Sequence, residues 1–321
     1  MVLLPTPYQP TVEKIYKSYE DKNTDPFRQH LGASLIGTEC QRKLWYGFRF
    51  CSSPNFSGRL LRLFQTGFKE EARIIDELRN IGVCVYDRDP CDGKQISYSE
   101  PDCPMFSGSL DGIGIGFEEA PKTYHVIEIK TSSSKAFVKM KKEGVQISKP
   151  LHYAQIQTYL RWSGLDRAFY FMVNKDTDEI YSERVYFEKD FAESLVGKAK
   201  RVIFSEVPLE KISDNPDSMF CKWCEHSGTC HYGKLPLVSC RTCSFVTPNQ
   251  DGTWQCGRDD SILGEAKQKA GCDGHIFIPQ LVPLPAVDSD PEVGTITYGS
   301  IVNGPGFVAS KDLQAVIDGV K

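Results

Sequence analysis

Several features that would place a sequence in a familiar class are missing from this one. Its 321 residues contain no apolar run of about 18 residues, the length that spans a bilayer, so we expect no transmembrane helix and no membrane partner. A basic segment followed by an apolar run, which marks a secretion signal, is also missing, so we expect a cytoplasmic protein. The phosphate-binding loop of ATPases does not occur, which excludes a fused helicase motor.

A surplus of positive charge is missing as well. Lysine and arginine together number 38 against 42 aspartates and glutamates, and the formal net charge is −4. Nothing in the overall charge therefore attracts nucleic acid, and any such binding has to depend on a local basic surface. Hydrophobic residues make up 40% of the chain, which is enough for a packed core in one large domain with an appendage or in two domains.

Cysteine, by contrast, is abundant, with 12 residues in the chain. In a protein without a secretion signal, clustered cysteines indicate metal binding more than disulfides. One group lies within ten residues: Cys221, Cys224 and Cys230. Three thiolates need a fourth ligand to complete a tetrahedral or cluster site. Cys40 is the leading candidate, whereas His226 or His231 would make a zinc site instead.

A second group of metal-ligand residues follows: Cys240, Cys243, Cys256, Cys272 and His275. The Cys-x-x-Cys pair, a strand around Trp254 and a second half-site downstream indicate a zinc ribbon. Both Cys272 and His275 have suitable spacing, so either could provide the fourth ligand.

The stretch from residue 124 to residue 130 predicts a buried strand, because its branched apolar residues favour β-structure. The period of two along a strand places Glu128 and Lys130 on one face. Asp111 lies on a preceding glycine-rich strand that can pair beside this one as a hairpin, so two carboxylates and an ammonium would lie close together. Crowded carboxylates are costly unless a cation neutralises them, and Mg²⁺ or Mn²⁺ suits oxygen ligands. On its own, such a trio is more often an ordinary surface ion pair, so other motifs have to decide.

Helices and strands alternate on both sides of this stretch. We expect helices over residues 11–20, 31–50, 59–81, 134–142, 151–162 and 191–204. We expect strands over residues 83–86, 95–98, 106–110, 112–117, 124–130, 167–173 and 179–187. Residues 279–309 are rich in proline and glycine, and a short helix follows Ser310. The pattern predicts an α/β fold with a mixed sheet flanked by helices.

Three details of these helices carry further expectations. Ser34 is the expected N-cap of the helix over residues 31–50. Gly67 interrupts the 59–81 helix, which indicates close approach of another backbone or of a ligand. The lysines of the 134–142 helix form either a solvated face or a surface that meets phosphates.

Four motifs occur in a fixed order: Gly67-x-x-x-Glu71, Gly108-Ser109-Leu110-Asp111, Glu128-Ile129-Lys130 and Gln155-x-x-x-Tyr159. In this order they resemble the PD-(D/E)xK nucleases, and the last motif resembles the RecB and lambda-exonuclease branch. Cys40, taken with Cys221-x-x-Cys224-x₅-Cys230, resembles the iron–sulfur nucleases of that branch, which include the AddB nuclease domain and the CRISPR-adaptation nucleases. The resemblance covers about residues 31–232. The whole chain is also similar, more weakly, to phage recombination exonucleases with an appended zinc ribbon.

The resemblance implies a restriction-endonuclease-like fold and a DNA nuclease, in particular an exonuclease, that uses Mg²⁺ or Mn²⁺. It assigns the metal to Asp111, Glu128 and the Ile129 carbonyl, while Glu71 would bind through water or hold a second ion. Lys130 would orient the attacking water. Many iron–sulfur members of the branch have histidine in the first motif, where this chain has Glu71.

The resemblance also implies roles for the remaining motif residues. Gln155 and Tyr159 would position the DNA strand or the metal-binding carboxylates. Four cysteines would hold a [4Fe–4S] cluster, or zinc in its place, as a structural staple between the two ends of the domain: Cys40, Cys221, Cys224 and Cys230. Zn²⁺ would occupy the ribbon, where its ligands would be Cys240, Cys243, Cys256 and either Cys272 or His275.

The chain would then consist of four parts: an N-terminal extension over residues 1–30, the nuclease domain over residues 31–232, a zinc-ribbon module over residues 233–280 and a Pro/Gly-rich tail over residues 281–321. DNA, as single strands or duplex ends, is the expected partner. The resemblance also admits a partner protein that acts in recombination or replication. The alternative is a non-catalytic DNA-binding or scaffold protein that keeps this fold and uses the ribbon to grip DNA or a partner. A zinc-dependent hydrolase is disfavoured because no His-x-x-x-His pair occurs.

Overall fold

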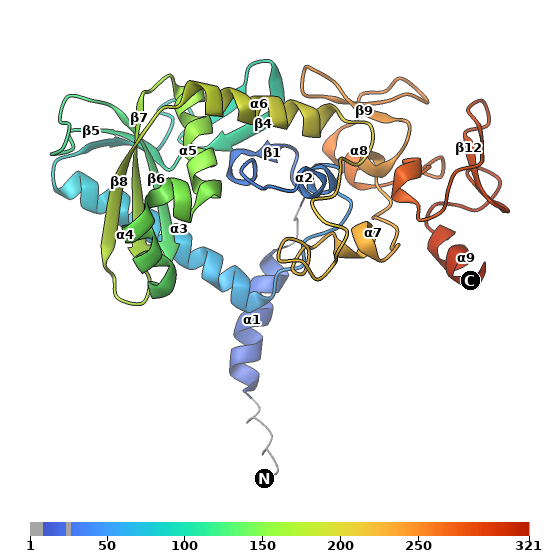
Figure 1. The fold of residues 1–321 in the computed structure, drawn as a ribbon, viewed down its shortest axis with the longest axis horizontal. Helices are drawn as coiled ribbons and strands as arrows, with labels where there is room; N and C mark the ends of the chain where they lie inside the picture. Colours follow the sequence, from blue (N-terminus) through green and yellow to red (C-terminus); the bar gives the residue numbers. More distant parts are fainter. Residues whose placement is uncertain (1–8, 24–26, 321) are drawn as a thin grey trace, which may run out of the picture.

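The central feature of the fold is a five-stranded mixed sheet (Figure 1). The computed structural model describes residues 9–23 and 27–320. The strands of this sheet lie in the order β2 (Cys84–Tyr86), β5 (Gly112–Ile115), β6 (His125–Ser132), β7 (Arg167–Asn174) and β8 (Ile180–Tyr186). β6 and β7 are parallel, and the other neighbours are antiparallel. The predicted α/β fold with a mixed sheet is therefore confirmed.

β6 is the central strand, and both of its faces are covered. Ile127 and Ile129 point into a hydrophobic cluster that they share with Phe169 of the neighbouring strand. Because side chains alternate along a strand, Glu128 and Lys130 point to the opposite face, as the sequence predicts. The two charged residues are thus fixed in place by the burial of their apolar neighbours.

Helices cover the two faces of the sheet (Figure 1). α3 (Gly58–Asn80) packs on one face, where Ile74, Ile75 and Leu78 are buried against β6 and β7. Three further helices lie on the opposite face or beyond it: α4 (Ser134–Ser148), α5 (Pro150–Ser163) and α6 (Lys189–Phe204). Gly144, with a φ of +72°, interrupts α4 just after the predicted 134–142 helix.

A small second sheet joins the N-terminal part of the chain to its centre. β1 (Leu31–Gly32) is parallel to β4 (Cys103–Ser109), which is antiparallel to β3 (Ser97–Glu100). The 3₁₀ helix η1 (Ala33–Leu35) follows β1 directly. The start of the predicted 31–50 helix is therefore wrong, because these residues pair with a strand far along the chain.

α2 (Gln41–Phe48) occupies only the end of that predicted helix. Its N-cap is Cys40, whose sulfur accepts a hydrogen bond from the first turn at 3.4 Å. Ser34, the expected N-cap, lies in η1 instead, so that prediction is also wrong. A Cβ at Gly37 would come within 2.7 Å of the backbone of α5, which indicates that the chain crosses α5 closely before α2 begins.

α3 extends beyond the core. Its C-terminal half buries Ile74, Ile75 and Leu78, whereas the other half, against which α1 (Pro10–Lys22) lies, exposes large apolar side chains such as Phe64 and Phe68 (Figure 1). A Cβ at Gly67 would meet no atom within 4 Å, so the expected close approach of a backbone at this position is not found in the described residues. None of the helices in residues 9–23 and 27–320 is long and apolar enough to cross a bilayer.

The segment after residue 232 shares the main core instead of packing separately. It contains η2 (Cys240–Thr242), β9 (Val246–Pro248), β10 (Trp254–Cys256), α8 (Glu265–Lys269) and η3 (Pro279–Leu281). β9 and β10 form an antiparallel hairpin, which confirms the strand expected around Trp254. Val246, Trp254 and Ile278 belong to the same hydrophobic cluster as residues of α2, α5 and α6. That this segment is a zinc ribbon stays a prediction.

The C-terminal part holds more structure than a Pro/Gly-rich tail. An antiparallel meander is formed by β11 (Asp288–Asp290), β12 (Thr295–Tyr298) and β13 (Ile301–Asn303). α9 (Leu313–Val320) confirms the short helix expected after Ser310. Ile296, Tyr298 and Leu313 belong to a separate hydrophobic cluster that also includes Ile276 and Phe277 of the preceding segment.

Candidate functional site

A β-hairpin brings Asp111 and Glu128 together. β5 pairs with β6 in an antiparallel register that sets Gly112 opposite Ile127. Asp111 directly precedes β5, and its Oδ2 accepts a hydrogen bond from the backbone N–H of Ile129 at 2.7 Å. The expected hairpin is therefore confirmed, and the two carboxylates lie on neighbouring segments of one sheet.

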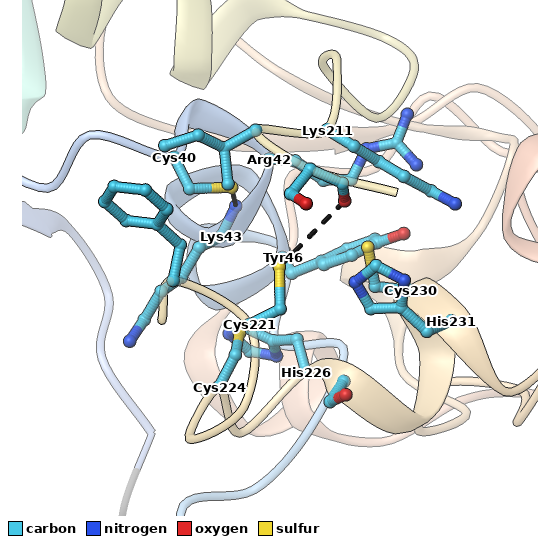
Figure 2. Close-up of a pocket in the computed structure, with 14 residues that line it drawn as sticks. Cys40, Arg42, Lys43, Tyr46, Lys211, Cys221, Cys224, His226, Cys230 and His231 are labelled. Carbon is cyan, nitrogen blue, oxygen red and sulfur yellow. Dashed lines mark hydrogen bonds between the residues drawn. The ribbon is translucent and has the colours of Figure 1, made fainter. Parts of the chain in front are cut away.

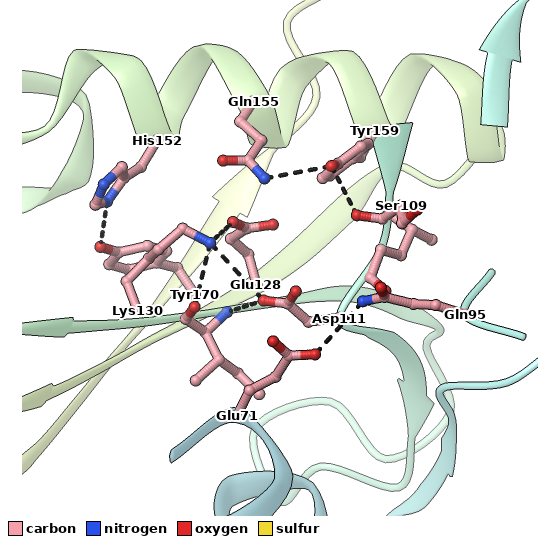
Figure 3. Close-up of polar contacts among 12 residues, drawn as sticks. Glu71, Gln95, Ser109, Asp111, Glu128, Lys130, His152, Gln155, Tyr159 and Tyr170 are labelled. Atoms are coloured by element: carbon pink, nitrogen blue, oxygen red, sulfur yellow. Dashed lines mark hydrogen bonds and ion pairs between the residues drawn. The ribbon is translucent and has the colours of Figure 1, made fainter. Parts of the chain in front are cut away.

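Lys130 links the two carboxylates (Figure 3). Its ammonium forms an ion pair with Glu128 Oε1 and lies 3.9 Å from Asp111 Oδ2. The same ammonium donates a hydrogen bond to the Ile129 carbonyl at 3.2 Å. Asp111 and Glu128 are 8% and 0% exposed, so both carboxylates are largely shielded from water, whereas Lys130 is partly exposed.

Burial makes both carboxylates costly to ionise without a further cation. It raises the pKa of Glu128 to about 8, a shift that Lys130 opposes and the charge on Asp111 increases. Burial also raises the pKa of Asp111. Glu128 Oε2 is buried and has no hydrogen-bond partner in the described residues. Hard oxygen donors in this state suit a divalent cation, which would take up the unpartnered oxygen.

Glu71 approaches the same site from α3. Burial, followed by the charge on Asp111, raises the pKa of Glu71 to about 7. Gln95 holds this carboxylate in place, because its Nε2 donates to Glu71 Oε1 at 3.4 Å and to the Leu110 carbonyl at 2.7 Å. Sequence reasoning missed Gln95, since a glutamine at the start of a predicted strand carries no signal of such a role.

Gln155 and Tyr159 lie on the face of α5 that meets the site (Figure 3). Gln155 Nε2 donates to the Tyr159 hydroxyl oxygen at 3.3 Å, and that hydroxyl donates to the Ser109 carbonyl at 2.7 Å. Gly108 leaves room for this contact, because a Cβ there would lie 2.9 Å from the Tyr159 hydroxyl. Both side chains therefore hold the end of β4 just before Asp111.

These residues surround one pocket of about 620 Å³. Five predicted site residues line it: Glu71, Asp111, Lys130, Gln155 and Tyr159. Glu128 and Ile129 do not line the pocket. The Glu128 carboxylate forms an ion pair with Lys130, and Lys130 does line it. Arg28 and Arg88 bring positive charge to the pocket, and His30 lies beside them. Sequence reasoning missed all three, because only the fold places them near the acidic motifs.

Two of the lysines of α4 form ion pairs with glutamates. Lys139 lies 3.6 Å from Glu143, and Lys141 lies 2.5 Å from Glu179. These exposed pairs favour the solvated-face interpretation for the two lysines.

The first cysteine group lies around a second, smaller pocket (Figure 2). All four expected cysteines line it: Cys40, Cys221, Cys224 and Cys230. Cys40 comes from the N-cap of α2, and Cys230 lies on α7 (Ser227–His231). Burial raises the pKa of both Cys224 and Cys230, and the nearby Cys40 adds to each shift. The fold thus gathers thiols from two distant parts of the chain.

The histidines considered as alternative ligands also line this pocket. His226 is 4% exposed, and its Nδ1 lies 2.7 Å from Ser52 Oγ, so one ring nitrogen already has a partner. His231 lies at the end of α7. Arg42 and Lys43 line the same pocket and would balance the negative charge of thiolates there.

The second cysteine group gathers around η2. Four of its thiols interact electrostatically: Cys240, Cys243, Cys256 and Cys272. Burial, together with the three other thiols, raises the pKa of Cys240 to about 11. His275 has other neighbours, because its Nε2 lies 3.2 Å from Thr242 Oγ1 and its ring packs edge-on against Phe277. This arrangement favours Cys272 over His275 as the fourth ligand.

No assembled metal-ligand geometry occurs in the part of the chain that the structure describes. Within it, no group of three or more His, Cys, Asp or Glu side chains is placed so that it could hold a metal ion. At the acidic site, protein groups bind the carboxylates instead, as Lys130 does for Glu128. The divalent-metal, iron–sulfur and zinc assignments therefore stay predictions.

Comparison with known proteins gives only distant likenesses. No protein-family model matches the sequence, and no curated protein is recognisably similar to it. The structure is similar to LHK-Exo, an alkaline exonuclease from Laribacter hongkongensis, solved in complex with dAMP, with a TM-score of 0.40 and 15% identity over 59% of this chain and 90% of that chain. It is also similar to SSO0001, with a TM-score of 0.40 and 18% identity over 69% of this chain and 96% of that chain. Likenesses at this level carry no conclusion about activity.

Proposed function

We propose that the protein is a DNA exonuclease that depends on Mg²⁺ or Mn²⁺. The observation that carries this proposal is the convergence of Asp111, Glu128 and Lys130 beside one open pocket, with a buried carboxylate oxygen of Glu128 left without a partner. The Gln155-x-x-x-Tyr159 motif supports the exonuclease assignment through its resemblance to the lambda-exonuclease branch.

The donor set fits a hard divalent cation. Asp111, Glu128 and the Ile129 carbonyl would hold it, and Glu71 would bind through water or hold a second ion. A bound ion supplies polarisation of the scissile phosphodiester and a lower pKa for the attacking water. The raised pKa values of Glu71 and Glu128 support this fit, because a cation would restore the charged form that burial disfavours.

Lys130 would act directly on the reacting groups. Its ammonium already lies between the two carboxylates and borders the pocket. From there it would orient the attacking water and stabilise the negative charge that develops on the phosphate. Gln155 and Tyr159 would act more indirectly, by fixing the end of β4 and with it the position of Asp111.

The pocket has features that suit a nucleic-acid strand. Arg28 and Arg88 would meet phosphates, and such contacts dominate nucleic-acid affinity. Phe68, which is 69% exposed on α3, lines the same pocket and offers a face on which a base can stack. These groups support single strands or duplex ends as the substrate.

End-labelled DNA tests this proposal. We expect the protein to degrade linear single- or double-stranded DNA with Mg²⁺ or Mn²⁺, to spare circular DNA, and to lose activity in EDTA. Asp111→Ala should abolish cleavage, because it removes a carboxylate that no neighbour replaces. Full activity in Asp111→Ala would remove the proposed site.

The alternative, a non-catalytic DNA-binding or scaffold protein, makes the opposite prediction. The observation that favours it is the ammonium of Lys130, which already pairs with Glu128 and lies 3.9 Å from Asp111 Oδ2, where a metal ion would bind. It predicts DNA binding that EDTA leaves intact and no cleavage with Mn²⁺. The same assay therefore separates the two functions.

A further inference from the structure

The C-terminal part of the chain supports one wall of the acidic pocket. We propose that Arg241 is a positioning residue: it fixes residues 27–30, which carry Arg28 and His30 to the pocket. Arg241 lies between Cys240 and Cys243, in a segment that the sequence predicts to be a separate appendage. The kinetic part of this inference rests on the proposed function, whereas its structural part does not.

The guanidinium of Arg241 is fully buried and fully engaged. It is 0% exposed and makes five hydrogen bonds, all to neutral oxygens. Nη1 donates to the Arg28 carbonyl at 2.8 Å, and Nη2 donates to the Gln29 carbonyl at 3.1 Å. The remaining bonds go to the Phe48 carbonyl and to Gln268 Oε1. A guanidinium has five N–H donors in a rigid fork, so Lys cannot reproduce this set.

Aromatic rings fix the same guanidinium from its faces. Its carbon lies 4.3 Å from the ring centre of Phe27 and 4.7 Å from that of Trp254. The ammonium of Lys269, on α8, also contacts Phe27 and lies 5.1 Å from its ring centre. Burying an arginine without an acidic hydrogen-bond partner is costly, and burial lowers the pKa of Arg241 to about 9. The free-energy cost of burying this charge indicates that the contacts of Arg241 with residues 27–30 have a role in holding that segment in position.

Residues 27–30 form neither a helix nor a strand, so they depend on such contacts. Directly after them, β1 begins at Leu31 and pairs with β4, the strand that leads to Asp111. Arg28 and His30 are exposed and line the acidic pocket. Arg241 therefore connects the cysteine-bearing segment to the charged rim of the pocket without lining the pocket itself.

This connection predicts a separation between substrate capture and chemistry. Loosening residues 27–30 displaces a cation from the pocket rim, so DNA should bind more weakly. Asp111, Glu128 and Lys130 lie in or beside the central sheet and Glu71 lies on α3, whereas the guanidinium of Arg241 forms its hydrogen bonds in the described residues with Arg28, Gln29, Phe48 and Gln268, so the chemical step should remain. We therefore expect Arg241→Lys to raise KM for a short single-stranded DNA about tenfold, the effect of losing one charge-assisted contact, with kcat within about twofold of wild type.

Arg49 provides a matched control. It is buried in the same interface, lies 5.2 Å from the Trp254 ring centre and donates to the backbone carbonyls of Ser205, Val246 and Arg241, but not to the Arg241 guanidinium. Within the described part of the chain, its hydrogen bonds and ring contacts are with residues other than 27–30. Arg49→Lys should cost similar stability and change KM less than about twofold.

Two further measurements test the positioning role of Arg241 directly. Trypsin should cleave the Arg28–Gln29 bond of the folded protein several-fold faster in Arg241→Lys than in wild type or Arg49→Lys. In an Arg28→Ala background, Arg241→Lys should change KM less than about twofold, because its effect acts through the same segment. If Arg241→Lys does not fold, Gln268→Met removes the oxygen that orients the guanidinium and should give the same changes, but smaller.

The outcomes separate the two proposals. An unchanged tryptic rate in a folded Arg241→Lys protein, or KM effects that multiply in the double variant, would overturn the positioning role. If the wild-type protein cleaves no DNA, the proposed function fails, and the tryptic rate alone decides whether Arg241 fixes residues 27–30.

Discussion

Glu128 is a fully buried carboxylate whose one polar side-chain partner is Lys130 in the described residues. Burial opposes a charge on Lys130, but Glu128 and Asp111 raise the pKa of Lys130 above its ordinary value, so it stays an ammonium. One positive charge then faces two carboxylates, with Glu71 nearby as a third. At the scale of the residue, the site lacks positive charge, and a divalent cation would supply it.

The stability of the metal-free protein should consequently fall as pH rises. A carboxyl whose pKa is higher in the folded than in the unfolded state stabilises the fold fully below the unfolded value, and this stabilisation is lost as pH rises through the folded value. For Glu128 the window runs from 4.5 to about 8, and Glu71, raised to about 7, acts in the same direction. We expect urea denaturation in EDTA to give a lower unfolding free energy at about pH 8 than at about pH 6.

Two variants test whether Glu128 causes this pH dependence of stability. Glu128→Gln should reduce the difference between the two pH values, since it removes the titrating group. Glu118→Gln, at an exposed position, should leave the difference unchanged. A metal-free protein whose stability rises over the same range would mean that the protein alone satisfies the charged form of Glu128.

Single residues differ in how far the sequence reveals them. Asp111, Glu128 and Lys130 could be predicted, because strand periodicity and a hairpin place them together without knowledge of the remaining fold. Gln95 and Arg28 could not, since their roles depend on contacts with segments far away or on a pocket that only the tertiary structure forms.

At the scale of the element, β4 and α5 meet so closely that Gly108 has no substitute. A Cβ there would lie 2.9 Å from the Tyr159 hydroxyl and 3.0 Å from Ala33 Cβ. We expect Gly108→Ala to lower the unfolding free energy by about 1–3 kcal/mol, as other overpacked sites do, and to reduce the proposed nuclease activity by shifting the strand before Asp111. Chemical denaturation and the cleavage assay measure the two effects.

Gly67 is the matched control, because it belongs to the first motif but has space around it. A Cβ there would meet no atom within 4 Å, and the residue lies inside α3. Gly67→Ala should therefore raise the unfolding free energy by about 0.5–1 kcal/mol. Equal destabilisation by both substitutions would contradict the contact assigned to Gly108.

The elements that the sequence predicted well are those with a strong local pattern, such as α3, β6 and α5. The start of the 31–50 helix could not be predicted correctly, because Leu31 pairs in parallel with Phe106 and this contact leaves no local trace. The strands of the C-terminal meander are short, and proline and glycine around them masked their pattern.

In the whole molecule, two of the connections between the early and late parts of the chain involve the cysteine-bearing segments. Cys40 meets the cysteines of residues 221–230, and Arg241 meets residues 27–30. Sequence spacing suggested the first connection, but not the second, because a single arginine in a Cys-x-x-Cys pair carries no signal of its partners. Both connections place the ends of the chain where they can support the central sheet.

The first connection predicts a coloured protein. We expect anaerobically purified protein to be brown, with absorbance at roughly 400 nm from thiolate-to-iron charge transfer. Cys40→Ser should lose the colour and lower the thermal midpoint, because the staple between the two parts of the chain is broken. Cys84→Ser, at an exposed cysteine outside both groups, should change neither. A colourless wild-type protein that contains only zinc would refute the cluster and assign zinc to both groups.

The most direct test of the account is the rate at which Lys130→Ala cleaves end-labelled DNA across a range of Mn²⁺ concentrations. Lys142→Ala, at an exposed lysine of α4, is the matched control. We predict wild-type rates for Lys142→Ala and a loss of at least about a hundredfold for Lys130→Ala that no Mn²⁺ concentration restores, because the ammonium that would stabilise the developing charge is gone. Cleavage by Lys130→Ala at the wild-type rate would contradict the assignment of this pocket as the catalytic centre.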